Sequence, residues 1–152
     1  MSQRKKRLQK LLDLRTREVD DRLGKLAEAR KREELAKQFM EREEAKLNAA
    51  HAERASAISR PFEVKSLTLS NDWLVSCARR VDLARQVLEK ARQTVHEAQA
   101  QVFAAKNELR KIELILQRVA NEERVRAERV EQRLTDEFAA ARVASEKRRG
   151  EA

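Results

Sequence analysis

Side chains that commonly carry out chemistry are few in this sequence, and they stand apart from one another. The two histidines, His51 and His96, lie in polar stretches, and neither belongs to an HExxH pattern or has a cysteine nearby. Metal sites need clustered ligands at defined spacings, so we expect no metal and no cofactor. The single cysteine, Cys77, cannot form an internal disulfide, which makes a reducing cytoplasm the default compartment.

Neighbouring carboxylates do not suggest acid–base catalysis either. They lie among lysines and arginines, where helical i,i+4 ion pairs are the expected arrangement, and a catalytic pair would need a cleft around it. Phosphate-binding loops are also excluded, because the chain has only two glycines. We therefore expect a protein that is not an enzyme. The carboxylate pairs are Glu33-Glu34, Glu43-Glu44 and Glu122-Glu123.

The composition indicates which elements hold these side chains. Of 152 residues, 40% are charged and 41% hydrophobic, whereas glycine occurs twice and proline once. So few glycines and prolines cannot supply the turns of a β-rich or compact α/β domain. The sequence also contains no run of about 20 apolar residues, the length that a membrane-spanning helix needs. The composition predicts an all-α protein of long helices that bury a narrow apolar stripe.

The breakers divide the chain into two helices. We predict a first helix over residues 3–58, a connection over residues 59–71 and a second helix over residues 72–148, which together form a single hairpin domain. The connection contains the only proline, Pro61, followed by a Ser/Thr/Asn-rich stretch. Ser70 or Asn71 is the expected N-cap of the second helix, and Gly150 lies where a C-terminal breaker is expected.

The second helix carries a regular seven-residue repeat. Its first set of seam positions is large and apolar, and its second set contains four successive alanines, a pattern that predicts a close-packed left-handed coiled coil. The first set is Leu74, Val81, Leu88, Val95, Val102, Leu109 and Leu116, and the second is Cys77, Ala84, Ala91, Ala98, Ala105, Ile112 and Val119.

The first helix is less regular. We interpret its apolar residues as one stripe that includes Leu26 and has an eleven-residue spacing, because Leu8 and Leu12 recur as Val19 and Leu23. This interpretation continues the stripe through Leu35, Phe39, Leu47, Ala50 and Ile58.

The short connection favours an antiparallel two-helix hairpin in which the second helix is the longer one, although two chains lying side by side would satisfy the same pattern. In the hairpin, the first helix ends near the level of residue 127, and about 20 residues of the second helix have no partner within the chain. An apolar stripe continues there through Val130, Leu134, Phe138 and Ala141, which suggests a partner protein.

Both ends of the chain are basic, and the net charge is +9. One interpretation is solubility together with a favourable helix dipole; the other is docking to an acidic protein or a nucleic acid. Nucleic acid is not favoured, because the chain has one tryptophan and no tyrosine for base stacking. The basic clusters are Arg4, Lys5, Lys6, Arg7 and Lys10, and Arg142, Lys147, Arg148 and Arg149.

One aromatic residue stands out beside the connection. Trp73 would lie in the first turn of the second helix, where it could close the hairpin or anchor a partner. Leu83 lies off the seam a few turns away and could share a contact surface with Trp73.

The sequence Ser70-Asn71-Asp72-Trp73-Leu74, opening the second of two long helices in a short basic chain, resembles the FliJ/YscO family of type III secretion systems. The resemblance implies a stalk protein in the cytoplasm, peripheral to the inner-membrane export machinery. Its free ends would enter the ring of the export ATPase hexamer, through Arg4, Lys5, Lys6, Arg7, Val130, Leu134, Phe138 and Arg142.

The resemblance also implies a contact between the opposite part and the cytoplasmic domain of the export-gate membrane protein, and with export chaperones in some members. Trp73 and Leu83 would form that gate end, whereas Arg79, Gln86 and Lys90 occupy other gate-facing positions of the family. Both the flagellar and the injectisome branch fit. The rival expectations are a homodimeric structural coiled coil, formed through the alanine-rich seam, and a basic coiled coil that binds nucleic acid.

Overall fold

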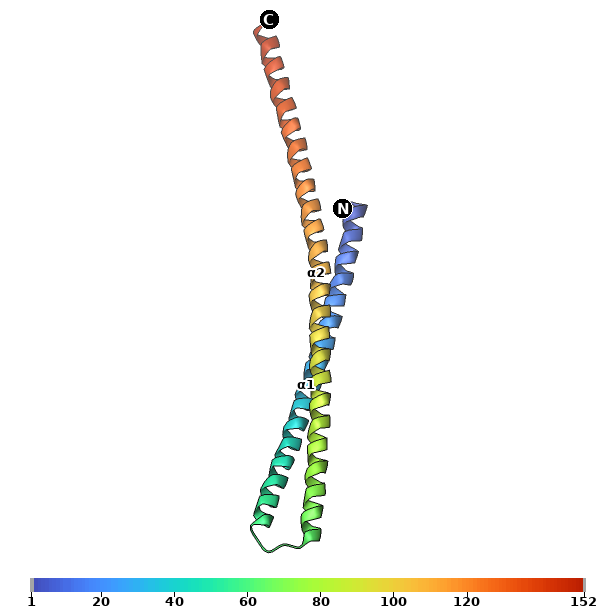
Figure 1. Cartoon of the computed structure of the whole chain (residues 1–152). Helices are drawn as coiled ribbons and strands as arrows, with labels where there is room; N and C mark the ends of the chain where they lie inside the picture. Colours follow the sequence, from blue (N-terminus) through green and yellow to red (C-terminus); the bar gives the residue numbers. More distant parts are fainter. Residues whose placement is uncertain (1, 152) are drawn as a thin grey trace. The chain divides into compact units, whose positions relative to one another are not determined.

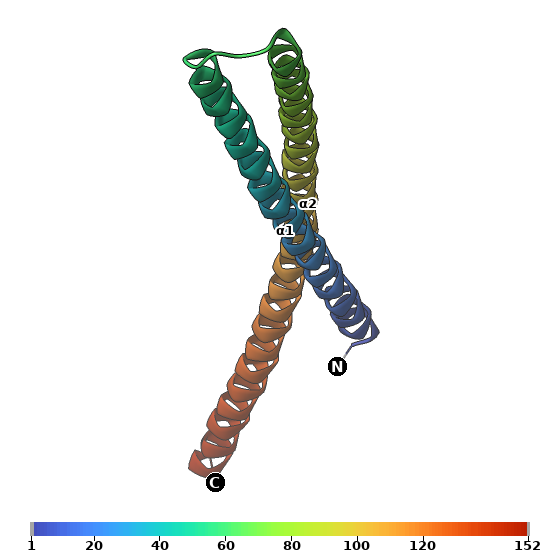
Figure 2. The same ribbon diagram turned by 90° about the horizontal axis from the view of Figure 1, so that it is seen from below.

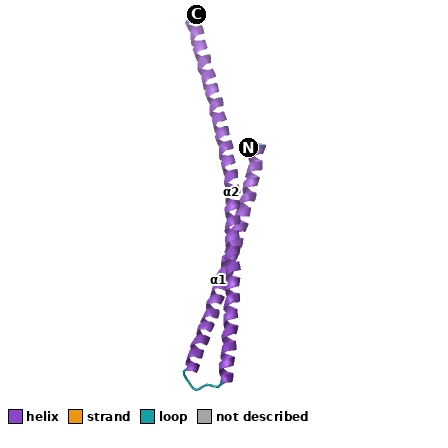
Figure 3. Ribbon diagram, viewed as in Figure 1, coloured by secondary structure: helices purple, strands orange, loops and turns teal. Residues whose placement is uncertain are grey.

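The protein folds as an all-α helical hairpin, as the sequence predicts. The computed structural model describes residues 2–151 and contains two helices, α1 (Gln3–Ile58) and α2 (Val64–Gly150), joined by a short connection (Figures 1 and 3). The second helix is the longer one, with 87 residues against 56. The described residues contain no strand.

Contacts divide the hairpin into two units. Unit 2 is Arg17–Lys106, which contains the connection and the parts of both helices nearest to it. Unit 1 combines the beginning of α1, up to Thr16, with α2 from Asn107 onward.

The seam of α2 in unit 2 follows the predicted seven-residue repeat. Val81 and Leu88 from the first set are almost fully buried, as are Cys77 and Ala84 from the second. The small residues of the second set, Cys77 and Ala84, let the backbones of the two helices approach closely. Cys77 is therefore a small apolar packing residue, grouped with Ala50 and Leu74 and covered by Leu47.

The seam of α1 agrees with the prediction at Val19, Leu26 and Ala50 and differs from it elsewhere. The buried residues recur every seven positions, and not at the expected eleven-residue spacing; they are Val19 and Leu26 in one row and Ala29, Ala36, Glu43 and Ala50 in the other. Four residues that we expected in the seam are exposed, namely Leu23, Leu35, Phe39 and Ile58. The physical reason is that the alanine row sets a close approach of the helices, which leaves no room for these larger side chains.

Pairs of polar side chains show the antiparallel register of the two helices. In unit 2, Arg85 of α2 forms an ion pair with Glu44 of α1 at 3.1 Å, and Arg22 donates a hydrogen bond to Gln101 at 3.1 Å. The residue numbers in these pairs add up to 129 and 123, close to the 130 expected from a hairpin folded near residue 65.

The connection is shorter than predicted, because α2 begins at Val64 and not at residue 72. Ser70 and Asn71 therefore lie inside the helix, and neither is its N-cap. Leu67 is half-buried seven residues before Leu74, so the seam continues into this stretch. The hydroxyl of Thr68 donates a hydrogen bond to the carbonyl of Val64 at 3.1 Å, which satisfies it within the helix.

Glu43 is the one charged residue in the buried row of α1. Only 5% of it is exposed, and its carboxylate lies 3.4 Å from the ammonium of the more exposed Lys46. A carboxylate in this position loses hydration, and a single partially exposed partner compensates for that loss only in part.

We predict that Glu43→Leu stabilises the protein by about 1 kcal/mol, because it removes the desolvation cost and extends the apolar row. Urea unfolding followed by circular dichroism measures this free energy. Glu43→Gln, which keeps the shape and removes the charge, should give a smaller gain. A lower midpoint for Glu43→Leu would show that the ion pair outweighs the cost of burial.

Candidate docking surfaces

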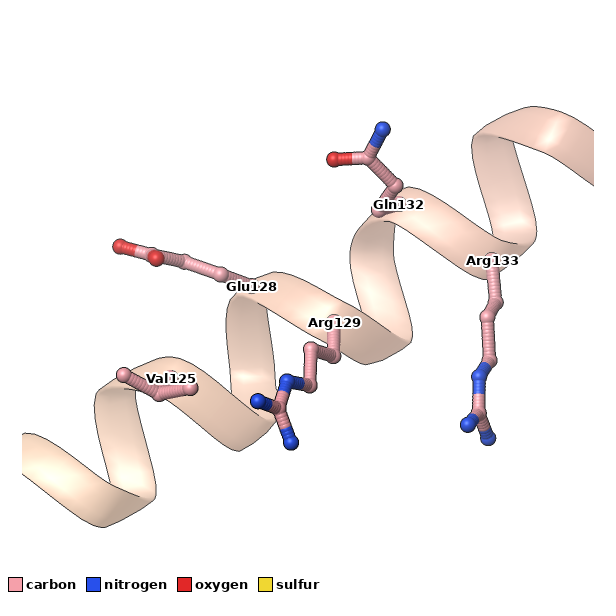
Figure 4. A pocket seen from close by; sticks show the side chains of 5 residues that line it. All are labelled: Val125, Glu128, Arg129, Gln132 and Arg133. Carbon is pink, nitrogen blue, oxygen red and sulfur yellow. The ribbon is translucent and has the colours of Figure 1, made fainter.

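The structure offers surfaces for partners and no enclosed chemical site among the described residues. No group of three or more His, Cys, Asp or Glu side chains in this part of the chain could hold a metal ion. Figure 4 shows one surface hollow, lined only by α2, in which Arg129 and Arg133 extend to one side of the helix and Gln132 to the other; Val125 and Glu128 complete its lining. Side chains spread along one helix face do not converge on a substrate.

One exposed carboxylate, that of Glu108, forms a helical ion pair of the kind expected from the sequence. Lys111 donates a hydrogen bond to Glu108 at 2.9 Å, and this contact, with the charge of Lys111, holds the pKa of Glu108 below its usual value. The pair is exposed and lies one helical turn apart, so it stabilises the surface of α2.

The first docking surface is the end of α2, residues 126–150, which we call the arm. Lys5 of α1 forms an ion pair with Glu123 at 3.2 Å in unit 1, and every arm residue beyond that level is exposed. In both views α2 continues well past the N-terminus of α1 (Figures 1 and 2). Helix α1 therefore ends close to the level of residue 127 that the sequence predicts, and α2 continues beyond it.

The arm keeps an apolar stripe without a partner in the chain. Val130, Leu134 and Phe138 are each more than half exposed, and 77% of Phe138 is accessible. Their spacing of four residues, continued by Ala141 three residues later, places them on one side of the helix. Val143 is also exposed but lies on the opposite side. The arm contains seven basic and five acidic residues.

The two predicted basic clusters do not form one patch. Arg4, Lys5, Lys6 and Arg7 lie at the start of α1, level with Glu123. Arg142 lies 19 residues further along α2, a separation of about 29 Å at the rise of an α-helix, and Lys147, Arg148 and Arg149 occupy the last turn of α2. The apolar stripe of the arm lies between the two clusters along α2.

The second docking surface is on α2 in unit 2. Trp73 is 48% exposed, and the guanidinium of Arg80 lies 5.5 Å from the centre of its ring. Because α2 begins at Val64, Trp73 lies in the third turn of the helix and not in the first. Leu83 is also exposed, and the spacing of residues 73, 80 and 83 places these side chains on one face.

The sequence analysis placed Leu35 and Phe39 in the seam of the first helix, whereas the structure places both on the surface. The signal that would have found them is the row Ala29, Ala36 and Ala50, whose seven-residue spacing excludes positions 35 and 39 from the seam.

The buried seven-residue rows of α1 and α2 define the class of this protein as an antiparallel two-helix coiled coil. The model of one family, described as Flagellar FliJ protein, matches residues 4–148. The chain belongs to the FliJ family, and it is thus a protein related to flagellar export. No curated protein and no solved structure matched the chain. In the part of the chain that the structure describes, neither helix is apolar enough over a sufficient length to span a bilayer.

Proposed function

We propose that this protein is a non-enzymatic stalk and adaptor of the export apparatus. The arm engages the ring of the export ATPase hexamer. The second docking surface, which contains Trp73 and Leu83, contacts the cytoplasmic domain of the export-gate protein, and export chaperones are further partners. In this role the protein works in the cytoplasm, against the inner-membrane machinery.

The observation that carries the proposal is the uncovered apolar stripe of the arm. Exposed side chains such as Leu134 and Phe138 are costly to leave in water along one face. A single helix can enter a pore that a pair of helices could not, and the basic residues on either side of the stripe suit an acidic pore lining.

The proposal is tested by adding the purified protein to the cognate export ATPase. We expect faster ATP hydrolysis and a larger fraction of assembled hexamers, measured by phosphate release and by size-exclusion chromatography with light scattering. An ATPase whose rate and assembly state do not respond to the protein would contradict the proposal.

The burial pattern also bears on the homodimer expectation. The alanine-rich seam of α2 is covered by α1 of the same chain, and Ala84 has no exposed surface. A dimer that used this seam would first have to open the hairpin. We therefore expect light scattering to give the monomer mass at every concentration.

The gate end gives a separate prediction. Trp73→Ala combined with Leu83→Ser should weaken binding to the cytoplasmic domain of the gate protein by tenfold or more, because buried tryptophan anchors dominate many interfaces. Isothermal titration calorimetry measures this affinity.

Val75→Ser is the matched control for the gate end, since Val75 is equally exposed on another face of α2. Unchanged gate affinity in the double variant would contradict the assignment of this face, while stimulation of the ATPase would remain an independent observation.

A further inference from the structure

One side of unit 2 differs in chemistry from the other. The two edges of an antiparallel coiled coil are distinct, because each edge is formed by equivalent heptad positions of both helices. The ion pair between Arg85 and Glu44 identifies one edge. A groove on the opposite edge is lined from both helices, by Lys25, Glu28, Ala29 and Arg32 of α1 and Thr94, Glu97, Ala98 and Gln101 of α2.

The second edge becomes apolar as it continues toward the connection. Phe39 occupies the same heptad position as Arg32, seven residues later in α1. Val87 occupies the same heptad position as Thr94, seven residues earlier in α2. Leu35 and Leu83 occupy the next position outward on their helices. All four side chains are between 45% and 60% exposed. The antiparallel register sets Phe39 level with residue 88, so the four residues form one patch across both helices.

The nearest charged residues around this patch are basic. The same two heptad positions hold Arg32, Arg42 and Lys46 on α1 and Arg80 and Lys90 on α2, and the nearest carboxylates in these positions, Glu28 and Glu97, lie beside Arg32 in the groove. We call these five residues, together with Leu35, Phe39, Leu83 and Val87, the basic–apolar face. Among the ion pairs that the structure describes, Lys46 alone of the five has a carboxylate partner, the buried Glu43.

The opposite edge shows that this composition is local. At the same level its two heptad positions carry five carboxylates and three basic side chains, so its charge has the opposite sign; these are Glu34, Glu41, Glu44, Asp82 and Glu89, with Lys37, Arg85 and Arg92. Charge is thus segregated at this level, with five basic side chains on one edge and a net charge of −2 on the other.

We propose that the basic–apolar face binds an acidic amphipathic α-helix of a partner protein. Its apolar side packs on the four-residue patch as a third helix along this edge of the hairpin, and its carboxylates pair with the flanking arginines and lysines. The charged residues extend over about 15 positions of α1, or about 22 Å, which matches four turns of a helix.

The charge and shape of the face favour this occupant over a nucleic acid. Phosphates alone would not cover an apolar patch of four side chains, and the one aromatic residue in it, Phe39, is flanked by aliphatic ones. The proposal shares Arg80 and Leu83 with the surface around Trp73 but adds α1, and its test requires neither the ATPase nor the gate protein.

The probe is a fluorescein-labelled synthetic peptide of about 18 residues with leucines at i, i+4, i+7 and i+11 and glutamates on both sides. Fluorescence anisotropy with the full-length protein measures its affinity. Two comparison peptides have the same composition in scrambled order, and lysine in place of glutamate. We expect the acidic amphipathic peptide to bind at least tenfold more tightly than either, with weaker binding at higher salt.

Two pairs of variants locate the binding. Phe39→Ser with Leu83→Ser should lower the affinity at least tenfold, whereas Val75→Ser, on the other edge, should not change it. Arg32→Glu with Lys90→Glu should also lower it at least tenfold, whereas Lys37→Glu with Arg92→Glu, a matched reversal on the other edge, should not. Circular dichroism confirms that each variant stays helical.

Three results would overturn the proposal. Equal affinity for all three peptides would remove the need for an amphipathic acidic helix. Tighter binding of a DNA duplex, lost in Arg32→Glu with Lys90→Glu, would make the occupant a nucleic acid. A concentration-dependent dimer that Phe39→Ser with Leu83→Ser converts to a monomer would make it a second copy of this chain.

Discussion

Replacing Leu134 and Phe138 with aspartate should abolish stimulation of the export ATPase. Both side chains are exposed on the arm, where no part of α1 covers them. If they insert into an apolar lining of the ring, two buried and unpaired carboxylates would cost more than the whole contact contributes. We expect phosphate release to fall to the rate of the ATPase alone.

The same double variant should keep its fold, because exposed positions without internal contacts have small effects on stability. Far-ultraviolet circular dichroism should show nearly unchanged helicity. Val143→Asp is the matched control, since this valine lies on the opposite side of the arm and is similarly exposed. Full stimulation by the double variant, or an equal loss with Val143→Asp, would contradict a specific role of the stripe.

Leu88→Ala should destabilise the hairpin by about 2–5 kcal/mol, the range for removing a large buried aliphatic side chain. Leu88 is 2% exposed in the seam of unit 2, between the close-packed Ala84 and the partly buried Ala91. A thin seam has no second layer that could collapse into the cavity. The measurement is urea unfolding followed by circular dichroism at 222 nm.

Leu114→Ala provides the comparison for this prediction. Leu114 lies on the same helix but is 47% exposed, so its truncation should change the free energy of unfolding by no more than about 0.5 kcal/mol. Similar midpoints for Leu88→Ala and the unsubstituted protein would mean that the seam of unit 2 contributes little to stability.

The sequence by itself determined the helical class and the seam of α2, and it favoured the hairpin over two chains lying side by side. Two glycines and one proline in 152 residues are too few for the turns of other fold classes, so long helices remain. Seven uninterrupted heptads define the seam of α2. The excess length of α2 and its uncovered apolar stripe followed from the same count, because both helices rise equally per residue. The family resemblance, which depended on the residues around Trp73, is confirmed over residues 4–148.

Only the tertiary structure decided which residues of α1 face α2. Leu35 and Phe39 are more apolar than Ala36 and Glu43, and a count of hydrophobic residues placed them in the seam. Packing against the alanines of α2 selects by size and register, and it keeps the smaller row inside. The start of α2 was decided in the same way, since burial of Leu67 extends the helix through residues whose types favour a loop. Local composition cannot report contacts with a distant segment, and those contacts place Phe39 beside Val87 on the surface.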